Sequence, residues 1–145
     1  MASKLSKYGF EFHNWDGGQG EADLFGLSHA VIVPKDARRI ILSGQVGIKA
    51  DGTVPEDLGE EIREAFRHVF LSLKAAGLGD DAFEHIYSLI TFSTSKDGNG
   101  IGEVLIPIAK EYFKNTRPAW TGVEVSALYL PTLHLEIRVE AYLPN

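Results

Sequence analysis

The strongest candidates for chemistry lie in the segment LHLEIRVEAYL, near the end of the chain. Its residues alternate in polarity, so a β-strand would turn the apolar side chains from Leu133 to Ala141 towards a core. The opposite face would then carry His134, Glu136, Arg138, Glu140 and Tyr142. A carboxylate on that face, shielded by another subunit, could orient a water molecule or a substrate. A solvated face whose charges are neutralised across strands is the alternative explanation.

The preceding strand-like segment, RPAWTGVEVSAL, repeats this alternation. Val123, Val125 and Ala127 fall on one predicted face, and the other face carries Trp120, Gly122, Glu124 and Ser126. If the two segments are hairpin neighbours, Trp120, Glu124 and Glu136 project from the same side of the sheet. An aromatic wall beside carboxylates suits a small-molecule pocket. An oligomer interface anchored by the indole explains the same pattern equally well.

Other chemical patterns are weak. The five histidines show no compact metal-ligand spacing, so we expect no metal site. Ser43 lacks the setting of a nucleophile elbow. The glycine-rich segment DGGQGEAD lacks the Gly-Lys-Ser/Thr ending of a phosphate loop, so we interpret residues 16–23 as a flexible loop. No pattern calls for a cofactor.

Composition excludes several classes of partner. The chain has 145 residues, no cysteine and a formal net charge of -6. Nucleic acid is therefore not the expected partner, because phosphate binding needs clustered Lys and Arg. Apolar runs are too short to span a bilayer, and the first residues lack the apolar core of a secretory signal. We expect a cytoplasmic protein without membrane contact.

Hydrophobic periodicity predicts one α+β domain over residues 1–145. Two helices are expected at 57–76 and 103–113, the first because its apolar residues recur at helical spacing. Strands are expected at 28–33, 39–48, 85–94, 120–128 and 133–143, with a further edge strand at 8–15. Such helices usually pack on one face of a mixed sheet.

Four segments in this order resemble the reactive-intermediate deaminase family, also called Rid or YjgF. They are LSGQVGIKADGTVPED, LKAAGL, RPAW followed by VEVSAL, and LEIRVEAYLP. The resemblance runs from about Gly26 onward and leaves residues 1–25 as an N-terminal extension. It implies a chorismate-mutase-like fold, a homotrimer with clefts between subunits, and cofactor-free hydrolysis of 2-enamine or 2-imine acids to 2-keto acids and ammonia.

The resemblance also assigns site residues. In deaminating members a Pro-Ala-Arg tripeptide supplies the arginine that binds the substrate carboxylate, whereas this chain reads Pro118-Ala119-Trp120. Indole has one donor and no charge, so it suits stacking better than an ion pair. Glu136 matches the glutamate that helps position the attacking water. The resemblance also points to Ser28, Gly44, Gln45 and Gly122 as cleft positions, and Ile106 or Pro107 stands where a polar asparagine is common. Glu124 is a further candidate binding residue, because the alternation puts it on the face of Trp120.

Two classes of function follow from these observations. The first is an enzyme that acts on an imine, enamine or related reactive intermediate, by hydrolysis or a lyase step, but is not a standard 2-imino-acid deaminase. Glu136 would be its catalytic residue and Trp120 its binding platform. The second is a non-catalytic trimer that binds a small molecule or a protein partner. Endoribonuclease activity is disfavoured by the acidic composition. The sequence leaves the natural substrate and pathway open.

Overall fold

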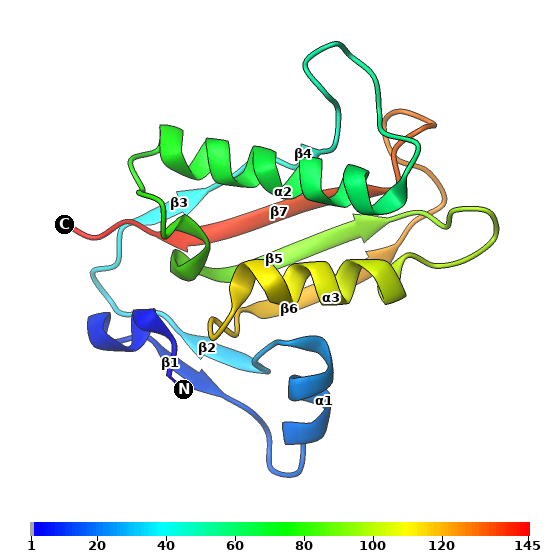
Figure 1. Ribbon diagram of the computed structural model, residues 1–145. Coiled ribbons are helices and arrows are strands. Elements are labelled where there is room, and N and C mark those ends of the chain that lie inside the picture. The colour runs from blue at the N-terminus through cyan, green and yellow to red at the C-terminus, as the bar shows by residue number, and fades with distance from the viewer. Residues whose placement is uncertain (1) are drawn as a thin grey trace.

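The computed structural model describes residues 2–145 and has two helices on one face of a mixed β-sheet (Figure 1). The long helix α2 spans Leu58–Ala75, and α3 spans Gly102–Phe113. Asp57 begins α2 as its N-cap, because its carboxylate accepts a hydrogen bond from the amide of Glu60. The apolar stripe of α2 faces the sheet, as its spacing predicts. The expected α+β fold is confirmed.

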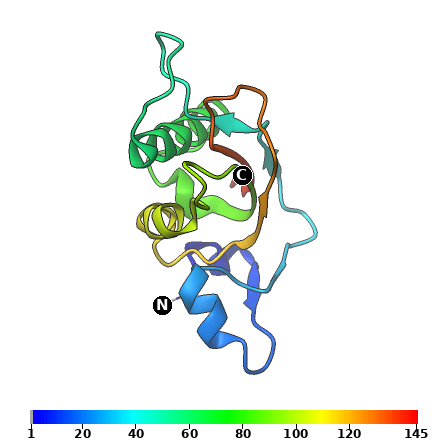
Figure 2. The ribbon, with the colours of Figure 1, turned by 90° about the vertical axis from the view of Figure 1, so that its right-hand side faces the viewer.

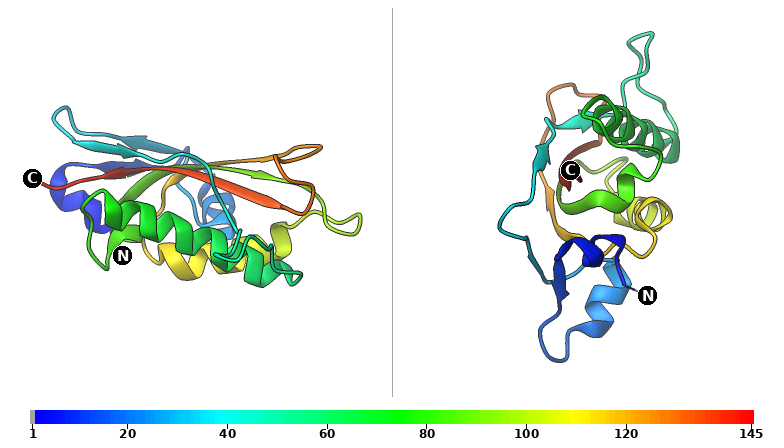
Figure 3. Two further views of the ribbon diagram at one scale, coloured as in Figure 1. Left: turned by 90° about the horizontal axis from the view of Figure 1, so that it is seen from above. Right: turned by 90° about the vertical axis from the view of Figure 1, so that its left-hand side faces the viewer.

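The main sheet has the order β3-β7-β5-β6, with β4 also paired to β7. Its strands are β3 (Arg39–Ile41), β4 (Gln45–Val46), β5 (Ile86–Ser93), β6 (Ala119–Glu124) and β7 (Leu135–Tyr142). β7 is antiparallel to β3, β4 and β5, whereas β5 and β6 run parallel. Helix α3 supplies the crossover that a parallel pair requires. The side views show both helices in one layer and the sheet in the other (Figures 2 and 3).

The main core lies between the sheet and the two helices. Every second residue of β7 is buried, from Leu135 to Ala141, as the alternation predicts. These side chains meet the apolar face of α2, where Ile62, Phe66 and Val69 have no exposed surface. The other face of the sheet has no helix against it (Figure 2).

The expected hairpin between β6 and β7 is wrong, because β5 lies between them. Leu89 of β5 is in register with both Trp120 and Val139, so these residues share the helix-covered face of the sheet. Phe92 is in register with both Val123 and Glu136, which therefore share the opposite face. Val123 is 41% exposed and does not belong to the core face.

The N-terminal extension is an ordered part of the structure. Its strand β1 (Glu11–His13) pairs with β2 (Ala30–Ile32) in a separate two-stranded sheet, so an edge strand does form here. The flexible loop predicted for residues 16–23 is wrong in its second half, because Gln19–Phe25 form the short helix α1. Gly18 precedes this helix, and a side chain there would collide with Trp15 and His29.

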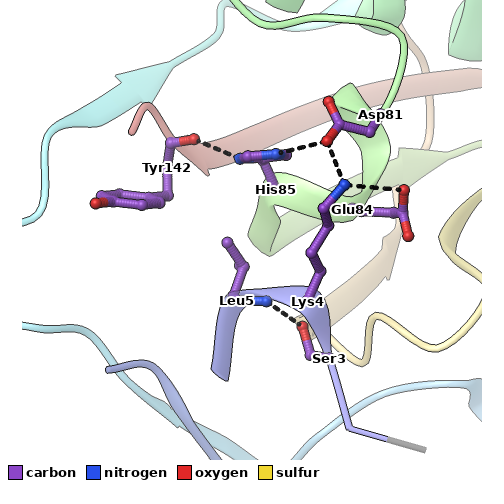
Figure 4. A network of polar contacts seen from close by, with 7 residues as sticks. All are labelled: Ser3, Lys4, Leu5, Asp81, Glu84, His85 and Tyr142. Carbon is purple, nitrogen blue, oxygen red and sulfur yellow. Dashed lines mark hydrogen bonds and ion pairs between the residues drawn. The ribbon is translucent and has the colours of Figure 1, made fainter. Parts of the chain in front are cut away.

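A polar network joins the first turn of the chain to the main domain (Figure 4). Lys4, in the 3-10 helix η1 (Lys4–Tyr8), donates to Asp81 at 2.5 Å. Asp81 also lies 3.3 Å from Nε2 of the buried His85, whose Nδ1 is 3.1 Å from the Tyr142 carbonyl. The hydrogen bond from Lys4 lowers the pKa of Asp81, so this bond favours the charged carboxylate of Asp81.

Within residues 2–145, no helix is both long and apolar enough to cross a membrane.

Candidate functional site

A cavity of about 450 Å³ lies on the helix-covered side of β6, between that strand and helices α1 and α3. One wall consists of Thr91 and Ser93 from β5 with Trp120, Gly122 and Glu124 from β6. The α3 wall includes Ile101, Leu105 and Ile106, and α1 contributes Glu21 and Phe25. The cavity therefore brings together three of the sequence-predicted residues, Trp120, Gly122 and Glu124.

Trp120 is held in place by one specific hydrogen bond. Its Nε1 donates to the hydroxyl of Thr91 at 3.0 Å, and Thr91 is only 2% exposed. The indole packs against the main core while one part of it lines the cavity. Gly122 keeps the neighbouring space open, because an added Cβ would lie 3.3 Å from the Thr91 hydroxyl. This arrangement presents a fixed aromatic surface to a ligand.

Glu21 is a cavity residue that the sequence analysis missed. It lies on α1 in the N-terminal extension, and its Oε1 is 3.1 Å from Nε2 of His29. His29 in turn stacks on Trp15, with ring centroids 4.4 Å apart. The resemblance begins only at about Gly26, and the glycine-rich segment around Glu21 hid the helix that places it.

Two cations, Arg117 and Lys110, are bonded to α1. Arg117 donates to the Asp23 carboxylate at 3.0 Å and to the Ala22 carbonyl at 3.3 Å, and Lys110 donates to the Asp23 carbonyl at 2.9 Å. Arg117 lowers the pKa of Asp23, with a smaller contribution from Gln19. Arg117 and Lys110 therefore fasten α1 to the domain. Both line a separate cavity of about 120 Å³ that also reaches Trp120 and that Lys114 lines as well.

Glu136 does not share the cavity with Trp120 within one chain. It lies on the uncovered face of the sheet beside Gly44, where an added Cβ would come within 2.1 Å of its Oε2. Gln45 follows Gly44 at the start of β4, and Val46 is in register with Glu136. The sequence-predicted residues Gly44 and Glu136 thus form a second group on this face, whereas Gln45 is in register with the buried Ile137 and lies on the helix-covered face.

Ser28 belongs to neither group. It is 5% exposed, and its amide donates to the Pro118 carbonyl, which joins the N-terminal segment to the start of β6. It lines a polar cavity of about 470 Å³ together with Asn14, Asp23 and Arg117. Its backbone bond gives Ser28 a positioning role for the strand that carries Trp120.

His134, whose place the sequence left open, binds Glu61 of α2. Glu61 has no exposed surface, and its two oxygens accept from the His134 amide at 2.6 Å and approach His134 Nδ1 at 2.7 Å. This contact fixes the chain just before β7 begins. Arg138 and Glu140 share the uncovered face with Glu136. Among residues 2–145, no group of three or more His, Asp or Glu residues could hold a metal ion.

The fold and this arrangement define a small α+β protein with a cavity at the edge of its sheet, and comparisons with known proteins place it in a family. Residues 24–143 match the family model described as Endoribonuclease L-PSP. The chain is 32% identical over 107 residues to the RutC family protein YjgH of Escherichia coli, which covers 73% of this chain and 76% of that protein. The protein therefore belongs to the Endoribonuclease L-PSP family, that is, the Rid/YjgF family.

Solved structures support this assignment. The Rid family protein YyfB from Yersinia pestis, described as of unknown function, superposes with a TM-score of 0.74 at 25% identity. That similarity covers 92% of this chain and 98% of the other. A second Yersinia pestis Rid protein, YyfA, also of unknown function, gives a TM-score of 0.62 at 29% identity, with 80% and 86% coverage. The resemblance inferred from four sequence segments is confirmed.

Proposed function

We propose that this protein binds a small molecule without a carboxylate group in the Trp120 cavity and hydrolyses an imine or enamine there. Glu136 of a neighbouring copy would orient the attacking water. The proposal departs from ordinary 2-imino-acid deamination because an indole stands where that activity uses an arginine.

The lining of the cavity is the observation that carries the proposal. Its walls are largely apolar and aromatic, and they include two carboxylates, Glu21 and Glu124. No Lys or Arg is among the residues that line it. An anionic imino acid would lose its hydration there without gaining an ion pair, which is costly in a partly dry site. A ligand with no negative charge would stack on Trp120 without that cost.

The position of Glu136 argues for a second copy of the chain. Because Trp120 and Glu136 lie on opposite faces of one sheet, they reach the same ligand only if each comes from a different protomer. The uncovered face that carries Glu136 also exposes apolar side chains, with Ile41 at 53% and Val123 at 41%. Such a face is suited to burial against another subunit. A homotrimer with shared clefts, as the family resemblance implies, satisfies both conditions.

The reaction balances without a cofactor. Water adds to the carbon of an iminium ion, R₂C=NH₂⁺, while the Glu136 carboxylate accepts a proton from that water. Glu136 then returns this proton to the nitrogen of the carbinolamine, ammonia leaves as the C–N bond breaks, and it takes up the hydroxyl proton, so the products are R₂C=O and NH₄⁺. The protein supplies the bound orientation, the general base and a surface that excludes bulk water.

Two other functions compete with this proposal. A non-catalytic binding trimer would use the same cavity but would not need the Glu136 carboxylate. RNA cleavage, which the name of the family model suggests, is disfavoured by the net charge of -6 and by the acidic groups in the cavity. A phosphodiester is the ligand least suited to these walls.

Mixed oligomers test the proposal. Trp120→Ala and Glu136→Gln are prepared separately and then co-expressed, and hydrolysis of phenylmethanimine, generated in place from benzylamine, is followed as benzaldehyde release. Light scattering establishes that each variant assembles like the wild type. If Trp120 and Glu136 meet across subunits, random mixing restores about a quarter of the sites, because an intact site needs one wild-type residue from each protomer.

Each result has a distinct meaning. We expect both single variants to be inactive and the mixture to regain activity. A wild type that binds the ligand without accelerating its hydrolysis would support a binding protein, and turnover that survives in Glu136→Gln would show that this carboxylate is not the base. Variants that are inactive alone and stay inactive when mixed, despite normal assembly, would contradict a shared site.

A further inference from the structure

The N-terminal extension contributes a charged wall to the Trp120 cavity. Helix α1 ends at Phe25, so Glu21 and Phe25 reach the cavity from an element that lies almost wholly before residue 24, where the family match begins. Four contacts fix α1, namely those that Arg117 makes with Ala22 and Asp23, the bond from Lys110 to Asp23, and the contact between His29 and Glu21. These contacts hold the helix, and the Glu21 side chain, which is 51% exposed, is held by His29 alone among them.

His29 holds the Glu21 carboxylate in an orientation that leaves it free to accept more bonds. Only Oε1 contacts the imidazole, at 3.1 Å, so Oε2 has no partner in this contact. The other imidazole nitrogen, Nδ1, is buried and makes no hydrogen bond. A proton on Nε2 suits this setting, because it is donated to the carboxylate while Nδ1 stays unprotonated. His29 thus orients Glu21 through Oε1 alone.

Three groups around the cavity favour a positive charge. Glu21 and Glu124 are carboxylates on two different walls, and Trp120 presents the aromatic ring that binds cations best. We infer that the ligand of this cavity is an organic cation, an iminium or ammonium compound with an apolar body. Glu21 is a residue that determines this specificity. The inference rests on the function proposed for the cavity.

The surroundings of the cavity agree with a cationic ligand. The protein carries a formal net charge of -6, which attracts cations to its surface. Of the three cations that line the smaller cavity at Trp120, Arg117 and Lys110 are bonded to α1, and the third, Lys114, does not line the Trp120 cavity. An iminium ion is also the form of an imine that water attacks most readily, so one charge would serve both binding and reaction.

Three probes of similar shape test the charge preference. Calorimetry measures binding of benzylammonium, benzyl alcohol and benzoate to the full-length wild type, Glu21→Gln, Trp120→Ala and a control variant, Glu103→Gln. Glu103 is exposed in the first turn of α3 and does not line the cavity. All titrations use low and moderate salt, because attraction between partly exposed charges weakens as salt screens it.

We expect the wild type to bind benzylammonium about tenfold more tightly than benzyl alcohol, with benzoate weakest. Glu21→Gln should remove most of that preference while leaving benzyl alcohol binding unchanged, and Glu103→Gln should change neither. Equal affinity for the cation and the alcohol, or a Glu21→Gln variant that keeps the preference, would overturn the inference but leave the Trp120 site intact. Binding of no probe, or binding that Trp120→Ala does not affect, would instead overturn the proposed site itself.

Discussion

Trp120 and Glu136 lie on opposite faces of the same sheet, on strands separated by β5. The indole faces α3 and the cavity, whereas the carboxylate stands beside Gly44 on the face without helices. Under the proposed function, one chain therefore carries two half-sites rather than one complete site. This relationship makes assembly a condition of the proposed chemistry, and it makes the effects of several substitutions predictable.

Gly44→Ala should reduce turnover without unfolding the protein. The added methyl group would meet the carboxylate of Glu136, whose flexible side chain would move aside. Displacing a general base by about 1 Å costs on the order of 10- to 100-fold in rate. Gly79→Ala is the matched control, because its new Cβ would make only an ordinary contact at 3.7 Å with Asp81. Steady-state rates and thermal unfolding of both variants check this, and full activity in Gly44→Ala would contradict it.

Thr91→Val should destabilise the protein and loosen the cavity wall. The hydroxyl of Thr91 is the acceptor for Nε1 of the partly buried Trp120, and valine replaces it with a methyl group. An indole donor left without a partner costs about 1–3 kcal/mol. Urea unfolding should show this loss for Thr91→Val but much less for Thr91→Ser, which keeps the acceptor. Equal stability of the two variants would show that the bond contributes little.

Glu61→Ala should be among the most destabilising single substitutions. It would leave the His134 amide without its partner and open a void beneath the start of β7. We expect a loss of about 3 kcal/mol or more in the free energy of unfolding. Glu60→Ala is the comparison, because Glu60 is the exposed neighbour on the same helix. If chemical denaturation gave similar losses for both, the contact between α2 and β7 would not have the structural role assigned to it.

Asp81→Asn should weaken the attachment of the N-terminal extension in a pH-dependent way. The hydrogen bond from Lys4 lowers the pKa of Asp81 in the folded state below its ordinary value of 3.8. Stability that comes from such a depressed pKa is present above the unfolded value and is lost as pH falls through the folded one. The wild type should therefore exceed Asp81→Asn in stability above about pH 4. The difference should shrink below that pH, and a constant difference would refute the ion pair's contribution.

The sequence predicted individual helices and strands better than it predicted which strands lie side by side in the sheet. Alternation identified the buried face of β7 and helical spacing identified α2, since both patterns depend on residues close in the chain. It could not show that β5 inserts between β6 and β7, because strand order depends on how α3 crosses the sheet. The prediction that Trp120 and Glu136 share one face of the sheet was wrong for that reason.

Candidate site residues were predicted in part for similar reasons. Trp120, Gly122 and Glu124 meet in one cavity because they share a face of a single strand. Glu21 was missed because its glycine-rich surroundings favour a loop. Its own partner, His29, lies 8 positions later, and Arg117, which bonds Asp23 of the same helix, lies 94 positions beyond that aspartate. Tertiary contacts, rather than helix propensity, account for α1.

The central claim is that Trp120 has replaced recognition of a substrate carboxylate. It is tested by the rates at which wild type and Trp120→Arg hydrolyse 2-aminoacrylate and phenylmethanimine, both generated in place, with ammonia release above the uncatalysed rate as the measure. We expect wild type to accelerate hydrolysis of phenylmethanimine only, and Trp120→Arg to gain activity on 2-aminoacrylate while losing it on phenylmethanimine. Efficient hydrolysis of 2-aminoacrylate by the wild type would contradict the claim, because the carboxylate would then be recognised without an arginine at position 120.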